Sequence, residues 1–351
     1  MRLLILTQVV DTEDPILGFF HAWIETFAQE VEHVEVVCLR KGKCAFPKNV
    51  SVHSLGKEIG TLKIVRLWRF YYYLFSLRNQ YDAVFVHMNP EYVVLGGIFW
   101  RSMHKKIGLW FTHKSVNWRV RMAAHLAHVI FTASKESFRF PSKKVCVTGH
   151  GIDVSLFVPE IALREITALR LISVGRISPI KKYELMFEAL GVLRAKGIDA
   201  TLTLVGEPVA EKDTVYAQSL REIVASKKLP VVFQGGLSHH KVPQALREAD
   251  IFLNCSETGG LDKALLEAWV AGLYVVTTND GVTTVAREID ASLPITADPE
   301  KIAEKIGEWS KLTDAEKEAY REKARIYVAA AHGLSVLIHT IVTRLKEPLH
   351  G

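Results

Sequence analysis

The chain alternates short apolar runs, rich in β-branched residues, with longer segments of helical composition. The runs that predict strands in the first half are residues 2–8, 34–40, 83–88, 107–113, 129–134 and 144–150. Those of the second half are 169–175, 200–206, 231–236, 251–256, 274–278 and 293–296. The helices predicted between them are 18–31, 67–77, 181–197, 215–228, 240–249 and 263–272. This alternation predicts βαβ units, so we expect an α/β fold of two Rossmann-like, doubly wound parallel sheets with helices on both faces.

The two halves are expected to be separate domains. A chain of 351 residues, 49% of them hydrophobic, is long enough to bury two cores. The alternation is interrupted at residues 159–169, where a proline and a polar connector precede a new first strand. We predict an N-terminal domain over 1–160, a second domain over 161–330, and a last helix within 331–351 that crosses back to the first domain. Because ligands collect at the carboxyl ends of parallel strands, we expect the two sheets to face each other across a cleft.

Charge and cysteine content narrow the class of protein. The formal net charge of +6 and the pI of about 9.0 favour anionic partners such as phosphates. The four cysteines lack the spacing of a zinc site or a disulfide framework, and a D-x-D pattern for a metal-bound diphosphate is missing. The first ten residues suit a buried strand better than a secretion signal, and no apolar run approaches the roughly 20 residues of a membrane span. We therefore expect a cytoplasmic protein without a metal or cofactor.

One segment, residues 61–80, combines aromatic and basic side chains. Its cations are Lys63, Arg66, Arg69 and Arg78, and its aromatic residues are Trp68, Phe70, Tyr71, Tyr72, Tyr73 and Phe75. This composition suits a helix in a membrane interface, and stacking on the bases of a single nucleic-acid strand is an alternative. A core helix with a basic outer edge explains it equally well. We expect peripheral contact with the inner face of the cell membrane and no nucleic-acid partner.

The stretch SVGRISPIKK, residues 173–182, predicts an anion site. A strand ends at Gly175, Arg176 follows, and Lys181 comes five residues later, where the next helix begins. A guanidinium and an ammonium beside the amino end of a helix can bind a diphosphate, because the cations and the unpaired N–H groups act together. Solvated charges on a loop are the alternative for this pair.

The stretch SETGGLDKALLEAWVAG, residues 256–272, places a turn before an apolar helix. The N–H groups of Gly259 and Gly260 are open to an anion, and Glu267 on the helix can accept hydrogen bonds from ribose hydroxyls. Asp262 is expected to cap the helix or to contact a sugar, and these two roles are compatible. The amino end of this helix therefore suits a phosphorylated sugar.

Taken in order, these motifs resemble those of the retaining glycosyltransferases of family 4, also described as glycosyl transferases group 1, which have the GT-B fold. GRISPIK is similar to the family's G-R-x-x-x-x-K phosphate clamp, and residues 231–256 followed by LLEAWVAGLYVVTT resemble its donor domain in order and spacing. GHGIDVSLF, residues 149–157, resembles the family's segment between the domains, and GFFHAWIETFA resembles its first loop and helix. The likeness covers most of residues 165–300.

The resemblance implies that the donor is a nucleotide-diphosphate sugar. Arg176 and Lys181 would bind its diphosphate and neutralise the charge that develops as the nucleotide leaves. Glu267 matches the second glutamate of the family's E-x7-E motif and would bind the ribose.

The first glutamate of that motif is replaced here by Gly259. We expect backbone N–H groups to hold the donor sugar instead, with help from Asp262 or Lys263. Glu257, two residues upstream, is the alternative. The remaining residues of the predicted donor-binding set are Gly175, Glu207, Gly235, Gly260 and Leu261.

The first domain holds the candidates for sugar and acceptor contact. His113 directly follows a predicted strand, where the family often carries a histidine beside the donor sugar, and we predict a catalytic role for it. His150 replaces the usual asparagine of the segment between the domains. The full set of candidates for acceptor or sugar contact is Asp14, Gly18, His21, His87, Asn89, Glu91 and His150.

The resemblance implies transfer of the sugar to an acceptor hydroxyl with retention of configuration. The basic aromatic segment 61–80 favours a lipid-linked or envelope acceptor, so we expect a role in cell-envelope, polysaccharide or glycolipid synthesis. The hydroxyl attacks the face from which the diphosphate departs, so no protein nucleophile is needed and the cations contribute most. A nucleotide-sugar epimerase and a phosphorylase are alternatives on the same fold. A non-catalytic nucleotide-sugar-binding scaffold is the alternative from another class, which Gly259 favours.

Overall fold

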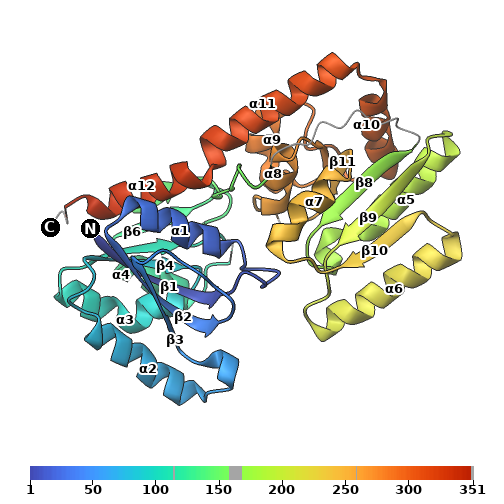
Figure 1. Cartoon of the computed structure of the whole chain (residues 1–351). Helices are drawn as coiled ribbons and strands as arrows, with labels where there is room; N and C mark the ends of the chain where they lie inside the picture. The colour runs from blue at the N-terminus through green and yellow to red at the C-terminus, as the bar shows by residue number, and fades with distance from the viewer. Residues whose placement is uncertain (114, 158–167, 258, 349–351) are drawn as a thin grey trace. The chain divides into compact units, whose positions relative to one another are not determined.

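The computed structural model of the chain describes residues 1–113, 115–157, 168–257 and 259–348 (Figure 1). The chain divides into two compact units. The first consists of Met1–Asp153, Ser238–His240 and Ala331–Gly351, and the second of Val154–Leu237 and Lys241–Ala330. Residues 158–167, which hold most of the predicted junction, lie outside the described residues.

The first unit is built on a seven-stranded sheet with the order β3-β2-β1-β4-β5-β6-β7, and all neighbouring strands are parallel. The strands are β1 (Arg2–Val10), β2 (His33–Lys41), β3 (Val50–Ser54), β4 (Ala83–His87), β5 (Lys106–Trp110), β6 (Val129–Thr132) and β7 (Val145–Val147). The helices are α1 (Phe20–Glu30), the turn η1 (Lys57–Ile59), α2 (Lys63–Ser76), α3 (Pro90–Ser102), α4 (Trp118–Leu126) and α12 (Leu334–Lys346). The strand order reverses between β1 and β4, and open α/β sheets bind ligands at such a point.

Strands β1 and β4 are almost continuously apolar because helices cover both faces of a parallel sheet. Leu4, Ile5, Val84 and Phe85 are all buried. Helix α1 packs on β2 and on α12, which also contacts β5. The start of α12 is joined to Ile152, near the end of the segment Met1–Asp153. Ile152 N donates to His332 O at 2.7 Å, and Leu334 N donates to Ile152 O at 2.8 Å.

The second unit is built on a five-stranded parallel sheet with the order β10-β9-β8-β11-β12. Its strands are β8 (Leu169–Val174), β9 (Ala200–Val205), β10 (Val231–Gly235), β11 (Ile251–Asn254) and β12 (Tyr274–Thr277). The helices are α5 (Tyr183–Ala195), α6 (Glu211–Lys227), α7 (Val242–Arg247), α8 (Lys263–Val270), α9 (Thr283–Ile289), α10 (Pro299–Lys311) and α11 (Asp314–His332), with short 3₁₀ turns η2 (Pro179–Lys181) and η4 (Asp280–Val282). The first two residues of the turn η3 (His239–Lys241) and the last two of α11 belong to the first unit. Here the order reverses between β8 and β11. Two doubly wound parallel sheets, as predicted, are therefore confirmed.

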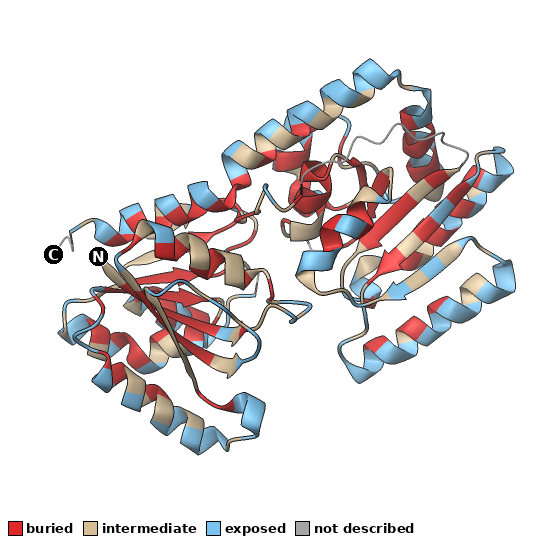
Figure 2. Cartoon of the chain, in the orientation of Figure 1, coloured by how far each residue is buried: buried red, intermediate tan, exposed pale blue. Residues whose placement is uncertain are grey.

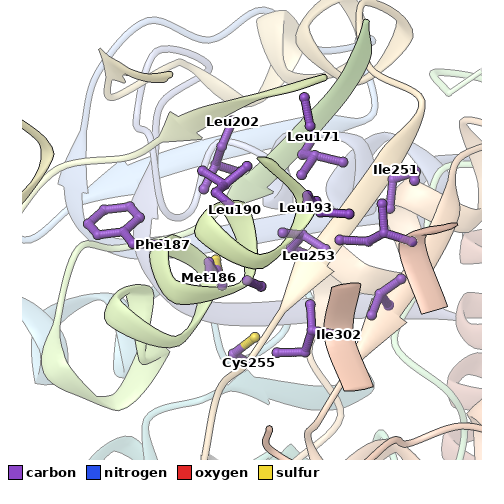
Figure 3. Close-up of a cluster of buried hydrophobic side chains, with 14 of the residues drawn as sticks. Leu171, Met186, Phe187, Leu190, Leu193, Leu202, Ile251, Leu253, Cys255 and Ile302 are labelled. Carbon is purple, nitrogen blue, oxygen red and sulfur yellow. The ribbon is translucent and has the colours of Figure 1, made fainter. Parts of the chain in front are cut away.

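The core of the second unit joins α5 and α10 to the sheet (Figure 3). Met186 and Leu190 of α5 are buried against strand residues such as Leu171 and Leu202, and Ile302 of α10 closes the same cluster. The positions on α5 that enter the core recur every three or four residues, as expected of a helix with one apolar face. This packing holds the carboxyl ends of β8, β9 and β11 in fixed positions.

Two details of the predicted pattern are wrong. Residues 293–296 form no strand: Ile295 N donates to Thr277 O at 2.9 Å, but Pro294 has no N–H with which to continue a ladder. The prediction also omits the segment VSVHS, which forms the edge strand β3. The helices α3, α4, α9, α10 and α11 are missing from it as well. Edge strands need only one paired side, so their sequences are less apolar.

In Figure 2 the central strands of both sheets are buried along most of their length, whereas α2 and α6 carry many exposed residues. Within the described ranges, no helix combines the length and the apolar character needed to cross a membrane.

Candidate functional site

The carboxyl ends of β8 and β11 meet at the reversal point of the second sheet, and one carboxylate joins the loops that follow them. Lys181 Nζ donates to Asp262 Oδ2 at 2.6 Å, although the two residues are 81 positions apart. Asn254, the last residue of β11, donates from Nδ2 to the same oxygen at 2.9 Å. Asp262 Oδ1 accepts from Ala264 N at 3.2 Å, so Asp262 is the N-cap of α8. The predicted capping role of Asp262 is confirmed.

Asp262 stays ionised in this network. Burial by itself raises the pKa of Asp262, but the charge of Lys181 and the hydrogen bonds from Lys181, Asn254 and the Ala264 amide hold that pKa below its ordinary value. The two side chains are each 14% exposed. The pair is therefore largely enclosed.

Glycines at the ends of β8 and β9 allow the two backbones to pack closely together near the Lys181–Asp262 pair. Gly175 and Gly206 follow β8 and β9 with φ values of 148° and 145°. A Cβ on Gly206 would lie 2.0 Å from Gly175 O, and one on Gly175 would lie 3.1 Å from Lys181 Nζ. Arg176, the next residue, is exposed. The ammonium of Lys181 thus lies directly over the end of β8.

The glycine turn before α8 packs on the loop that follows β12. Gly259 has φ 53°, and a Cβ on Gly281 would lie 2.0 Å from Gly259 C. Asn279 Nδ2 donates to Gly260 O at 3.1 Å. Glu257 N donates to Ile180 O at 3.0 Å. The turn is therefore fastened to the loops after β8 and β12 on both of its sides.

The carboxylates near this turn have partners in the chain. Glu267 is buried and forms an ion pair with Lys263, one helical turn earlier. Glu257, the alternative to Gly259, pairs with Lys182 at 3.2 Å and is 65% exposed. Lys263 is therefore close to the predicted ribose-binding carboxylate as well as to the predicted phosphate site.

The other predicted donor residues line the neighbouring strand ends. Glu207 Oε1 accepts from Gly236 N at 3.1 Å and so links the loops after β9 and β10. Gly235 has φ 83° at the end of β10. The Leu261 side chain is buried, so Leu261 can offer a ligand only its backbone. All nine predicted donor residues thus lie at strand ends of the second sheet or in the segments that follow them, as Arg176 and Lys181 do.

Sequence reasoning missed three residues of this edge. Asn254 and Asn279 follow apolar strands and fasten Asp262 and Gly260. Ser178 is buried between Arg176 and Lys181, and among the described residues its Oγ has no hydrogen-bond partner. Asn254 could have been predicted as a site residue, because it is a polar residue at the end of an apolar strand. No feature of the local sequence distinguishes Ser178.

In the first unit, His87 and Asn89 lie at the β1/β4 reversal point. Gln8 Nε2 donates to Asn89 Oδ1 at 2.7 Å, and the Thr7 hydroxyl lies 3.3 Å from His87 Nδ1. His87 is buried and its ring stacks on Phe20 at 4.1 Å. Burial, assisted by the nearby His150, lowers the pKa of His87 to about 3, so its imidazole is neutral. Met88 between them has φ 59°, a conformation that non-glycine residues adopt rarely and mostly at functional sites.

Asp14, Gly18 and His21 lie in the loop and helix that follow β1. Asp14 Oδ1 accepts from Ile16 N at 2.9 Å and Leu17 N at 2.7 Å, and Asp14 Oδ2 pairs with Arg40. A Cβ on Gly18 would lie 2.5 Å from Asp14 O, which explains the glycine. His21 stacks on Phe46 at 4.2 Å. Asp14 and Gly18 therefore shape this loop.

The remaining candidates lie farther along the same unit. His113 follows β5, is exposed, and accepts a hydrogen bond from Ser115 N at 3.1 Å. Glu91, in the first turn of α3, pairs with Arg119 at 3.3 Å on the surface. His150 lies beside Trp110, with ring centroids 6.4 Å apart. In the part of the chain that is described, no three His, Cys, Asp or Glu side chains are placed to hold a metal ion.

Part of the second unit matches a family model, and one relative shares about half of the chain. Residues 168–311, which contain the whole second sheet, match the family model of glycosyl transferases group 1. The putative colanic acid biosynthesis glycosyltransferase WcaL of Escherichia coli K12 is 29% identical over 196 residues, which cover 53% of this chain and 47% of that protein. The chain therefore spans about half the length of the curated relatives it matches.

Solved structures extend the likeness to both units. HepE from Anabaena, crystallised with UDP, has a TM-score of 0.75 and 17% identity, and the match covers 98% of this chain and 99% of that one. The same protein with UDP-glucose matches with a TM-score of 0.75 at 16% identity over 98% and 99% of the two chains. At this identity the likeness establishes the fold. The chain is thus an α/β protein of the GT-B fold whose residues 168–311 match the family model of glycosyl transferases group 1.

Proposed function

We propose that this protein is a retaining, metal-independent glycosyltransferase that moves a sugar from a nucleotide-diphosphate sugar to an acceptor hydroxyl. The observation that carries the proposal is the Lys181–Asp262–Asn254 network at the β8/β11 reversal point. It places a cation and the capped amino end of α8 together, inside the segment that matches the family model. A leaving diphosphate is stabilised by such preorganised groups.

Each group at this edge has a role in the proposed reaction. Lys181 and Arg176 bind the diphosphate and neutralise its charge as the bond to the anomeric carbon breaks. Glu267, which forms an ion pair with Lys263, accepts hydrogen bonds from the ribose. The N–H groups of the turn at Gly259 and Gly260 hold the sugar. No fixed nucleophile is required, because the acceptor hydroxyl attacks from the face that the diphosphate leaves.

The acceptor side is assigned to the first unit. His113, His87 and Asn89 follow β5 and β4 at the carboxyl edge of the first sheet, where ligands of such sheets bind. The name of the WcaL relatives, putative colanic acid biosynthesis glycosyltransferases, supports a role in envelope polysaccharide or glycolipid synthesis. UDP and UDP-glucose in the HepE crystals support a nucleotide-sugar donor. We propose that the reaction takes place at the cytoplasmic face of the membrane.

A non-catalytic nucleotide-sugar-binding scaffold is the second candidate. It is favoured by one observation: a glycine occupies the position of the family's first motif glutamate, and neighbouring Glu257 is exposed and paired with Lys182. Such a protein would keep the phosphate and ribose contacts and lose the group that acts on the sugar.

The test separates binding from turnover. The protein is incubated with a panel of nucleotide sugars, with and without lipid-linked and free saccharide acceptors, and release of the nucleoside diphosphate is measured together with thermal stability. Acceptor-dependent release with a retained anomeric configuration, unaffected by a metal chelator, is expected. Stabilisation by a donor without release in any combination would establish the scaffold instead, and an epimerised donor would identify an epimerase.

A further inference from the structure

Helix α2 leaves a continuous apolar stripe on the surface of the first unit. Ile64, Trp68, Tyr72 and Phe75 recur every three or four residues and are 68%, 65%, 53% and 50% exposed. The rings of Trp68 and Tyr72 stack at 5.5 Å. A helix on the surface of a parallel-sheet domain ordinarily exposes polar residues on this side. The stripe is therefore not explained by the packing of the domain.

The opposite face of α2 already serves the core. Phe70 and Leu74 are buried, and Phe70 stacks on Tyr92 at 5.5 Å. Arg69 reaches Leu55 O at 3.3 Å. Both faces of the helix are thus apolar, but only one is covered by the protein.

The exposed surface continues beyond α2. Tyr71 donates to Leu95 O at 3.3 Å and Phe75 contacts Phe99 at 4.5 Å, so α2 and α3 lie side by side (Figure 1). On α3, Leu95 and Ile98 are 39% and 73% exposed. Before α2, two further apolar side chains, Ile59 and Leu62, are each 70% exposed. Contiguous apolar surface of this kind marks an interaction site.

The charges around the stripe specify the partner. Between Ile59 and Tyr81 the chain carries four cations and no Asp or Glu. Lys63 and Arg78 are exposed, whereas Arg66 is partly buried and Arg69 donates to Leu55 O. Aromatic and aliphatic side chains on one face of a helix, flanked by cations, match an anionic phospholipid surface, where the apolar face enters the headgroup region and the cations meet the phosphates.

We propose that the stripe of α2, extended by Leu95 and Ile98 of α3, docks the protein on the surface of an anionic membrane. The helix lies in the plane of the interface and does not cross the bilayer. The docking depends on the first unit alone, so it does not require that the proposed transferase activity be correct.

The test is sedimentation of the full-length protein with vesicles. Binding is expected to vesicles that contain phosphatidylglycerol, to weaken in about 0.5 M salt because the cations are screened, and to be much weaker with pure phosphatidylcholine. The double variant Ile64→Ser, Trp68→Ser should lower the partition coefficient at least about tenfold, equivalent to ~1.4 kcal/mol. Lys63→Glu should lower it on anionic vesicles only.

Matched controls come from the second unit. Val215→Ser with Ile326→Ser removes apolar side chains that are 69% and 59% exposed, and Lys212→Glu reverses an exposed charge on α6. These variants should bind vesicles as the unmodified protein does. Circular dichroism and thermal unfolding verify that every variant is folded.

Three results would overturn the proposal. One is the absence of vesicle binding by the unmodified, folded protein. Another is equal binding by the stripe variant and the control variant. In the third, the unmodified protein does not bind vesicles, but it self-associates or binds a single-stranded oligonucleotide, and the stripe substitutions abolish that association. This result would identify a second copy or nucleic acid as the occupant.

Discussion

At the residue scale, Lys181 has the most specific role. Lys181→Ala and Arg176→Ala should each lower turnover at least about tenfold, or ~1.4 kcal/mol of barrier, because the charge on the leaving diphosphate loses a preorganised cation. The matched control is Lys196→Ala, which removes a lysine paired with Glu300 at 2.8 Å beyond the other end of α5. Steady-state release of nucleoside diphosphate measures the effect. Unchanged rates in both site variants would show that the clamp is misassigned.

We expect Asp262, which caps α8, to compete with a donor for Lys181. Asp262→Asn keeps a capping oxygen but removes the charge, so we expect tighter binding of a nucleoside diphosphate and, because the enclosed ion pair with Lys181 is lost, lower stability. Asp262→Ala also loses the cap, which should cost about 1 kcal/mol more. Calorimetry and urea unfolding measure the two quantities.

A cap elsewhere in the same unit provides the control for this prediction. Asp298 caps α10 by accepting from Glu300 N at 2.8 Å and Lys301 N at 3.1 Å. Asp298→Ala should lose a similar contribution from its cap and keep the donor affinity. If Asp262→Asn binds the diphosphate more weakly than the unmodified protein, the carboxylate assists binding and the competition is refuted.

At the scale of secondary-structure elements, one buried carboxylate fastens the edge strand β3. Glu35 of β2 accepts from His53 of β3 at 2.7 Å and from His33 at 2.8 Å. Burial raises the pKa of Glu35, but the hydrogen bonds from the two histidines outweigh it and the pKa is lowered below 4.5. A lowered pKa contributes stability above the pKa of the unfolded chain and loses it as the pH falls through the folded value.

Glu35→Gln should therefore destabilise the protein near neutral pH, and the difference from the unmodified protein should shrink below about pH 5 as Glu35 is protonated. Urea midpoints measured over a pH series test this. Glu318→Gln, an exposed carboxylate on α11, is the control and should run parallel to the unmodified protein. A difference for Glu35→Gln that stays constant down to low pH would mean that its cause is packing.

At the scale of the whole molecule, the two units have separate cores and the proposed donor site lies in the second. A bound donor should stabilise that unit by mass action, by about 2.7 kcal/mol at a concentration of 100 times Kd, and so raise its unfolding temperature. Differential scanning calorimetry with a nucleoside diphosphate measures the shift. The shift should be reduced in Lys181→Ala. An equal shift in that variant would place the ligand elsewhere.

The sequence predicts most of the fold because periodicity is a local property. Runs such as LLIL and AVFV are apolar throughout, which identifies strands that are buried on both faces. The prediction omits the edge strand β3 and wrongly makes residues 293–296 a strand, because strand formation at both places depends on the neighbouring backbone.

What the sequence determined by itself is the alternation that yields two parallel sheets, and the identity of the groups at the strand ends: Gly175, Arg176, Lys181 and the turn before Glu267. The tertiary structure alone decided that Lys181 meets Asp262. That contact requires β8 to lie beside β11, and strand order is set by the packing of helices between distant segments. Burial is likewise a property of the folded molecule. Tertiary packing therefore decides that the His87 imidazole is buried and neutral, and that one apolar face of α2 is exposed.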